Sequence, residues 1–81
     1  MNVKVLLFAT LRERAGSKFL ELEIPDAMNV GDLKRRIATD FPTLRETMNS
    51  VLVAINREYA FDEGLIPVNA EIAMFPPVSG G

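Results

Sequence analysis

Val3-Lys4-Val5-Leu6-Leu7-Phe8-Ala9, near the start of the 81-residue sequence, is the stretch that decides the fold, and its pattern predicts a β-strand. Successive side chains of a strand point to opposite faces of a sheet. The first three odd-numbered positions are aliphatic and form one face, whereas Lys4 and Phe8 share the other. The aromatic ring of Phe8 is therefore expected on the polar face of its strand.

A second strand follows after a short connection. Residues 10–15 fit a single helical turn that Gly16-Ser17 ends, and residues 18–24 then alternate polar and apolar side chains. The expected core face of this strand carries Leu20, Leu22 and Ile24. Because the connection is short, we expect the two strands to pair as a hairpin, which Pro25-Asp26 ends.

Residues 29–40 are predicted to form the main helix, with Asn29 as a favourable N-cap. Apolar residues then recur at helical spacing: Val30, Leu33, Ile37 and Phe41. The basic triplet Lys34-Arg35-Arg36 lies largely off this apolar stripe, so a solvated helix face is a better interpretation than an anion site. Phe41-Pro42 ends the helix.

The middle of the chain supplies two further strands. Residues 43–50 fit either a second short helix or a loop, and residues 51–55 are predicted to form a strand. Asn56-Arg57 is then expected to form a turn into a short strand at residues 59–61.

The last strand follows a loop, residues 62–69, in which Leu65 or Ile66 is expected to reach the core. In the final strand, residues 71–75, the second and fourth side chains point inward and Phe75 points outward. The order of hairpin, helix and further strands predicts an α+β fold, with a mixed sheet and one main helix packed on one face. Because one helix cannot cover both faces, the other face of the sheet meets solvent.

Composition limits the kinds of function. The length suits one domain, residues 1–76, followed by a flexible C-terminal tail, residues 77–81. The absence of cysteine and histidine removes thiol chemistry, the usual general base and the commonest metal ligand, so we expect neither a metal site nor a self-sufficient enzyme. A net charge of −2 argues against nucleic acid as the main partner. No apolar run is long enough to span a membrane, and a cytoplasmic protein is expected.

Three aromatic side chains are candidates for contact with a partner protein. Phe8 and Phe75 each share the phase of a charged residue in their strand, and Tyr59 lies in the short strand after the turn. Aromatic residues gathered on an exposed face mark a partner site more often than chance. The competing interpretations are isolated surface aromatics, which are common, or a phase shifted by one residue, which would bury them. Pro76, directly after Phe75, is included in the predicted interface.

The tail Phe75-Pro76-Pro77-Val78-Ser79-Gly80-Gly81 ends in two glycines and a carboxylate. The two prolines stop strand pairing and keep the chain extended. From Pro77 onward an extended chain reaches roughly 15 Å, which is enough to enter a cleft in another protein. Glycine has no side chain and can pass through a narrow channel. The residues predicted to insert are Pro77, Val78, Ser79 and Gly80, and the carboxylate of Gly81 is the predicted reacting group.

An ionised terminal carboxylate is a poor electrophile at neutral pH. A separate activating enzyme must first convert it into an acyl-adenylate with ATP, so we expect no cofactor bound by this chain itself. Attack by sulfide or a persulfide then gives a thiocarboxylate, whereas attack by a lysine amine gives an isopeptide. Because the chain has no cysteine, reactive sulfur can be held only at Gly81.

Three stretches resemble the MoaD family, the small sulfur-carrier subunits of molybdopterin synthase. These are Val3 to Ala9 followed by Leu11-Arg12-Glu13, then Val53-Ala54-Ile55-Asn56, and finally Phe75-Pro76-Pro77-Val78-Ser79-Gly80-Gly81. The resemblance covers nearly the whole chain, and the ending is its most specific part. The chain departs from the family pattern in two turns, at Arg57 and at Val68-Asn69-Ala70-Glu71.

The resemblance implies a β-grasp, ubiquitin-like fold. It also implies that a MoeB-type enzyme adenylates Gly81, which becomes a thiocarboxylate and donates sulfur to cyclic pyranopterin monophosphate in the large subunit, MoaE. The family complex is a heterotetramer, and its catalytic side chains would belong to the large subunit. Three alternatives stay open: a β-grasp sulfur carrier for thiamin or tRNA thiolation, a protein modifier that forms isopeptides through Gly81, and an interaction module with a passive tail.

Overall fold

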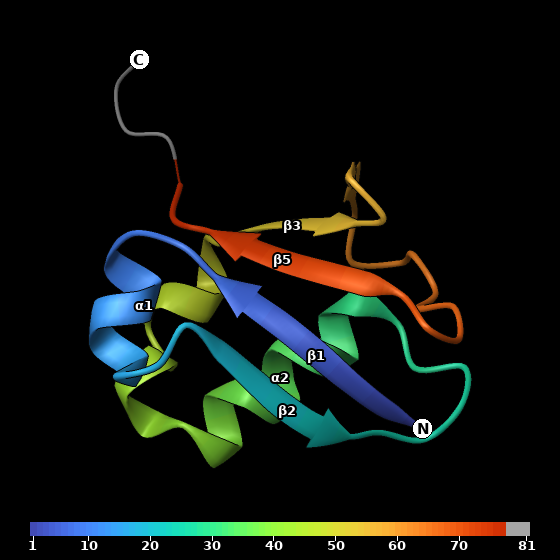
Figure 1. Ribbon diagram of the computed structural model, residues 1–81, viewed down its shortest axis with the longest axis horizontal. Helices are drawn as coiled ribbons and strands as arrows, with labels where there is room; N and C mark the ends of the chain where they lie inside the picture. The colour runs from blue at the N-terminus through green and yellow to red at the C-terminus, as the bar shows by residue number, and fades with distance from the viewer. Residues whose placement is uncertain (78–81) are drawn as a thin grey trace.

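The computed structural model describes residues 1–77 and shows a five-stranded sheet with α2 across one face (Figure 1). The strands are β1 (Asn2–Leu7), β2 (Phe19–Glu23), β3 (Leu52–Ile55), β4 (Glu58–Ala60) and β5 (Glu71–Phe75). The helices are α1 (Thr10–Ala15) and α2 (Val30–Asp40), with two 3₁₀ turns, η1 (Pro42–Leu44) and η2 (Thr47–Asn49).

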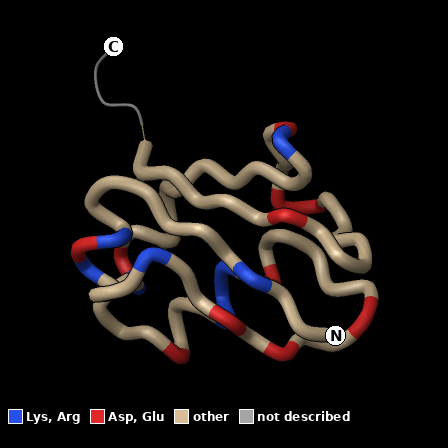
Figure 2. The backbone as a smooth tube through the Cα atoms, in the orientation of Figure 1, with Lys and Arg blue, Asp and Glu red and all other residues tan. Residues whose placement is uncertain are grey.

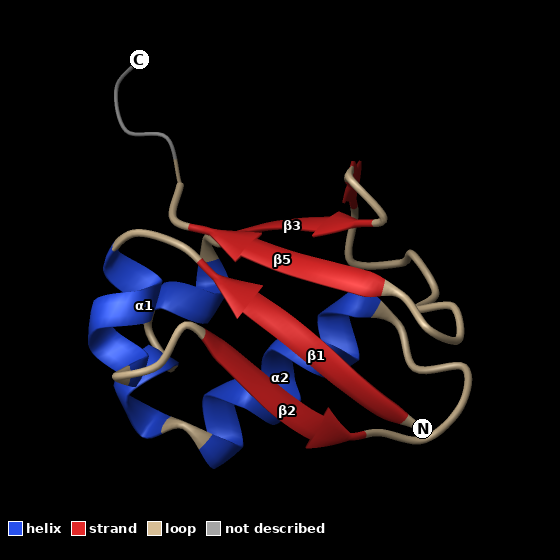
Figure 3. Ribbon diagram, in the orientation of Figure 1, coloured by secondary structure: helices blue, strands red, loops and turns tan. Residues whose placement is uncertain are grey.

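The strands lie in the order β2-β1-β5-β3-β4 (Figure 3). β1 pairs antiparallel with β2 and parallel with β5, and β3 pairs antiparallel with both β4 and β5. The predicted hairpin and the mixed α+β sheet are therefore confirmed. Because β1 and β5 run parallel, the end of the last strand lies beside the end of the first, and this brings Phe75 next to Phe8.

The core fills the space between α2 and the inner face of the sheet. The apolar stripe of α2 is fully buried at Val30, Leu33 and Ile37, as its spacing predicts. The strands contribute fully buried side chains to the same cluster, among them Val5, Ile72 and Met74. Burial of one such aliphatic side chain contributes about 1.5–3 kcal/mol, so the packing of α2 against the sheet is the main source of stability. On the opposite face, which we call the outer face, the side chains of β1 and β5 are exposed or half-buried.

The start of α2 depends on Asn29, whose side-chain Oδ1 accepts a hydrogen bond from the backbone N–H of Asp32 at 2.8 Å. Replacing an N-cap Asn with Ala costs about 1 kcal/mol. For a domain of this size, that loss corresponds to a fall in Tm of about 4–8 °C. We therefore expect Asn29→Ala to lower Tm by this amount in thermal unfolding followed by circular dichroism. Asn29→Asp retains the acceptor oxygen and serves as the control; equal Tm values for the two variants would contradict this role.

Acidic and basic residues are interspersed along the backbone (Figure 2), and carboxylates pair with the basic triplet of α2. Lys34 Nζ lies 2.8 Å from a carboxylate oxygen of Asp62, and Arg35 pairs with Asp32. Arg36 Nε lies 2.7 Å from Asp40, and Arg36 also donates to the backbone carbonyl of Glu23 at 3.0 Å. These pairs argue against an anion site. Arg35 is well exposed, as a solvated helix face requires, whereas the Lys34 side chain is only 19% exposed.

Two short segments show how the connections are made. α1 spans the residues predicted for it and ends at Gly16, whose φ of 72° places it in the left-handed region that favours glycine. The segment 43–50, for which the sequence left a helix and a loop open, contains η2 and the end of η1. Leu44 and Met48 anchor it, because both side chains are buried in the core.

Element ends differ from the prediction by one or two residues. β1 ends at Leu7 instead of Ala9, because Ala9 has a φ of 53° and turns the chain into α1. β4 begins at Glu58 instead of Tyr59, since the turn before it has only two residues. In the loop before β5, Ile66 is the residue that reaches the core, while Leu65 is exposed. Within residues 1–77, no helix has the length and apolar character needed to cross a membrane.

Candidate functional site

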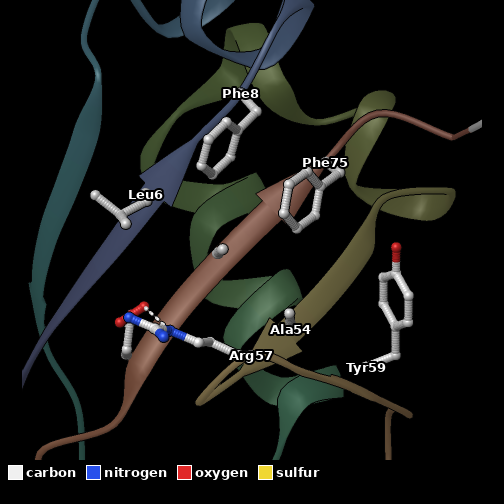
Figure 4. Close-up of a pocket in the computed structure, with 8 residues that line it drawn as sticks. Leu6, Phe8, Ala54, Arg57, Tyr59 and Phe75 are labelled. Carbon is white, nitrogen blue, oxygen red and sulfur yellow. Dashed lines mark ion pairs between the residues drawn. The ribbon is translucent and has the colours of Figure 1, made fainter.

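A shallow apolar hollow lies on the outer face of the sheet, with a volume of about 350 Å³ (Figure 4). It is lined by the outward-facing residues of β1, β5, β3 and β4, namely Leu6, Phe8, Ala54, Tyr59, Ala73 and Phe75, and by the ion pair of Arg57 and Glu71. The strand register explains this grouping: Leu6 lies opposite Ala73, Ala73 opposite Ala54, and Ala54 opposite Tyr59. Ala73 and Ala54 lie between Leu6 and Tyr59 in this register, and their small side chains form the bottom of the hollow.

Phe8 and Phe75 form a stacked pair at one end of the hollow. Their ring centroids are 4.7 Å apart and their planes differ by 15°. The backbone N–H of Phe8 donates to the carbonyl of Met74 at 3.3 Å, which continues the β1–β5 pairing by one residue and holds the two rings in register. Both rings are half-buried, and neither belongs to the core cluster. The predicted placement of these aromatics on the outer face is confirmed, whereas their contact with a partner stays a prediction.

Tyr59 lines the hollow from the edge strand β4 and is 74% exposed. An aromatic side chain this open has little role in the monomer core, and its apolar ring with a polar tip suits a protein interface. The structure thus brings Tyr59 together on one surface with Phe8 and Phe75, the two aromatics that the strand phases place on the outer face.

Charged residues occupy the outer face at the end away from the Phe8–Phe75 stack. Arg57 Nε lies 3.8 Å from a carboxylate oxygen of Glu71, and Lys4 Nζ lies 4.1 Å from the ring centroid of Phe19. Lys4 is also the register partner of Glu71. The outer face is therefore apolar near Phe75, where β5 ends, and charged at its opposite end.

The base of the C-terminal tail begins at the stacked aromatics. β5 ends at Phe75, Pro76 is half-buried and Pro77 is exposed. The two prolines also line a polar groove with residues from α1 and from the segment around η2, namely Thr10, Arg14, Glu46, Thr47 and Ser50. Val78, Ser79, Gly80 and Gly81 lie outside the described residues, so their predicted roles and the tail assignment 77–81 stay predictions.

The ionisable side chains of residues 1–77 are exposed or half-buried. Within this part of the chain, no group of His, Cys, Asp and Glu side chains is arranged to hold a metal ion, and no polar or charged residue is buried. A carboxylate or amine held away from water is the usual starting point for a tuned acid or base. The described residues offer an apolar hollow beside the base of the tail.

Sequence reasoning missed part of this site. Leu6, Ala54 and Ala73 line the hollow, and Arg57 with Glu71 forms its rim, yet none of them was a candidate. For Leu6 the signal was present, because it shares the strand phase of Phe8. The small residues carry no such signal, since their importance arises from their place between the aromatics.

Comparison with known proteins places the chain in a family. The ThiS family matches residues 5–81. The molybdopterin synthase sulfur carrier subunit of Arabidopsis thaliana is 36% identical over 81 residues, which cover 100% of this chain and 84% of that protein. The putative molybdopterin converting factor, subunit 1, of Pyrococcus furiosus has a TM-score of 0.84 and 28% identity, with 96% of this chain and 99% of that chain covered.

A modifier protein shares the same architecture. The small archaeal modifier protein 1 of H. volcanii has a TM-score of 0.82 and 26% identity, with 95% of this chain and 98% of that chain covered. Its ubiquitin-like fold, shared with the Pyrococcus protein, confirms the predicted β-grasp. The chain belongs to the ThiS family, and within that family it is related over its whole length to the molybdopterin synthase sulfur carrier subunits.

Proposed function

We propose that this protein is the sulfur carrier of a molybdopterin synthase and that it carries sulfur as a thiocarboxylate on Gly81. The observation that carries the proposal is the position of the tail. It follows directly on Phe75, so the residue that ends β5 also forms one half of the aromatic stack on the docking surface. A partner that binds the apolar hollow therefore lies beside the residues at which the tail begins. The relative named as a sulfur carrier subunit, similar over the whole chain, supports this function.

Loading requires two steps on a separate activating enzyme, which we propose is MoeB-like. First, a carboxylate oxygen of Gly81 attacks the α-phosphorus of ATP, and pyrophosphate leaves. A sulfide ion then attacks the acyl carbon and displaces AMP, which gives the thiocarboxylate. A persulfide donor gives an acyl disulfide instead, and a thiol releases the thiocarboxylate from it by forming a disulfide with the donor. ATP is a substrate of the activating enzyme, and we propose that this chain binds no cofactor of its own.

The receiving partner is a large subunit of the MoaE type, which we propose supplies the catalytic side chains. The relatives are named as subunits, of a synthase in one case and of a converting factor in the other. We propose that the large subunit covers Phe8, Tyr59, Phe75 and Pro76 and takes Pro77, Val78, Ser79 and Gly80 into its cleft. The thiocarboxylate sulfur then displaces an oxygen substituent from a carbon of cyclic pyranopterin monophosphate. Water hydrolyses the acyl–sulfur bond, which returns the carboxylate of Gly81 and leaves the sulfur on the pterin.

This function is tested by mixing the thiocarboxylated protein with the large subunit from the same genome and cyclic pyranopterin monophosphate. The expected result is a dithiolene product that consumes two carried sulfurs for each pterin. A mixture that lacks the large subunit serves as the control and should yield none. If the complete mixture forms no dithiolene while the thiocarboxylate stays intact, the protein is not the carrier for this reaction.

The second candidate function is a protein modifier, which the similarity to small archaeal modifier protein 1 favours. The activated Gly81 would then form an isopeptide with a lysine amine and release AMP. A third possibility within the family is sulfur delivery for thiamin or tRNA thiolation. The intact masses of the protein and of its conjugates separate these functions, because a carrier gains sulfur in place of oxygen, whereas a modifier appears attached to other proteins.

A further inference from the structure

The turn between β3 and β4 holds an arginine in a backbone conformation that suits glycine. Asn56 and Arg57 alone connect Ile55 to its register partner Glu58, and both have positive φ, 51° and 71°. Two positive φ angles are what a two-residue type I′ hairpin turn requires, and its usual second residue is glycine. Asn tolerates this region because its short side chain bonds locally, but Arg does not share that advantage. Position 57 therefore carries backbone strain that glycine would remove.

The monomer does not need the side chain of Arg57 to hold this turn. Asn56 holds it, since its backbone N–H donates to the carbonyl of Glu71 at 2.8 Å and its Oδ1 accepts from the backbone N–H of Glu71 at 2.9 Å. The Arg57 side chain is 88% exposed, and its contact with Glu71, at 3.8 Å, is beyond hydrogen-bond distance. An ion pair between two exposed side chains contributes little to stability.

Arg57 lies where its side chain can contact another protein. It lies on the rim of the apolar hollow, on the same surface as Tyr59 and Phe75 (Figure 4). The contact of Arg57 Nε with Glu71, at 3.8 Å, is too long for a hydrogen bond, so within the described part of the chain Glu71 does not hold the guanidinium as a donor and its fork can bind another group. Such a fork matches a carboxylate with two parallel hydrogen bonds, and arginine is enriched in protein interfaces for this reason.

We propose that Arg57 is a specificity-determining residue that binds a carboxylate on the protein docked over the apolar hollow. This inference rests on the proposed function, which makes that protein the large subunit of the synthase. The partner's surface should present an apolar patch for Phe8, Phe75 and Tyr59, and beside it an Asp or Glu side chain that meets Arg57. A protein that lacks this acidic group, such as the partner of another ubiquitin-like carrier, is then discriminated against even if its apolar patch fits.

The test measures Tm and the affinity for the purified large subunit from the same genome in three variants. Arg57→Gly removes both the strain and the guanidinium, so Tm should rise by about 4 °C while Kd weakens at least about tenfold. Arg57→Ala removes the guanidinium but keeps a side chain at positive φ, so it should weaken binding equally without the rise in Tm. Ala27→Gly is the matched control, because Ala27 also has a positive φ, 65°, but lies in the loop between β2 and α2, away from the hollow. It should raise Tm and leave Kd unchanged.

Two further measurements separate a contact with the partner from a structural role. Arg57→Lys retains the charge and should recover part of the affinity and of its salt dependence, which Arg57→Gly should lose. Glu71→Gln removes the carboxylate that competes for the guanidinium of Arg57 and should tighten the affinity. Binding of Arg57→Gly with the wild-type Kd and salt dependence would overturn the inference while leaving the proposed function intact. Failure of the wild-type protein itself to bind the large subunit would overturn the proposed function.

Discussion

A protein with one residue appended after Gly81 is expected to lose sulfur transfer completely while its fold stays unchanged. The added residue moves the carboxylate away from the two glycines and places a side chain where the proposed channel accepts none. The activating enzyme then meets the wrong terminal group, and no thiocarboxylate forms. The measurement is dithiolene formation in the full reaction, together with thermal unfolding to show that Tm matches the wild type.

The control for this prediction is recovery of activity in the same molecule. A protease site that leaves Gly81 as the last residue after cleavage lets the blocked protein be unblocked after purification. Activity should return on cleavage, because the described domain is the same before and after. Full activity in the uncleaved protein would show that the end of the chain is passive and would favour an interaction module.

The second large effect is expected at two neighbouring residues of β5 that face opposite sides of the sheet. Phe75 lies on the outer face in the stack with Phe8, whereas Met74 is fully buried in the core. Truncation of an interface hot spot costs about 2–4 kcal/mol of binding, so Phe75→Ala should weaken the affinity for the large subunit by roughly 30- to 1000-fold. Met74→Ala should instead lower the free energy of unfolding by about 2–5 kcal/mol. Calorimetric binding and chemical unfolding of both variants provide the two values.

The contrast between these neighbours decides whether the outer face is an interface. The loss of the Phe8–Phe75 contact should cost the monomer about 1 kcal/mol, since an aromatic pair contributes about 0.5–1.5 kcal/mol beyond its burial. Met74→Ala should bind with the wild-type affinity under conditions in which it is fully folded. If Phe75→Ala unfolds like a core variant and its folded fraction binds normally, then the aromatic pair serves stability and the partner docks elsewhere.

The periodicity of the sequence predicted most of the fold because the core is built from simple repeats. The inner faces of β1 and β5 alternate every second residue, and the apolar stripe of α2 follows helical spacing. Local rules also located Asn29 as the N-cap and Gly16 as the stop after α1. These features depend on neighbours along the chain, which a sequence displays directly.

The errors lie where backbone conformation departs from what the residue type favours. Ala9 and Arg57 both have positive φ, and neither residue type signals this in a sequence. As a result, the predicted first strand extends past Leu7. The 3₁₀ turns around Leu44 and Met48 could not be distinguished from a loop, because their form is set by burial of these two side chains against other elements.

The candidate site, like the fold, could be predicted from the sequence only in part. The strand phases of Phe8 and Phe75 predicted that both rings face outward, but their stacking depends on the parallel pairing of β1 with β5, which joins residues distant in the sequence. The hollow between Phe75 and Tyr59 depends in turn on the register that places Ala73 opposite Ala54. The sequence can therefore suggest candidate residues for the surface, but the pairing of distant strands decides which of them lie side by side.

The most direct test of the sulfur-carrier account is the intact mass of the protein after co-expression with a MoeB-like activating enzyme and a sulfur donor. The account predicts a mass increase equal to the replacement of one oxygen by one sulfur, located by fragmentation on Gly81 and lost when the large subunit and the pterin precursor are added. An unchanged mass in a protein that still supports dithiolene formation, or a mass that appears only in conjugates to lysine, would contradict it.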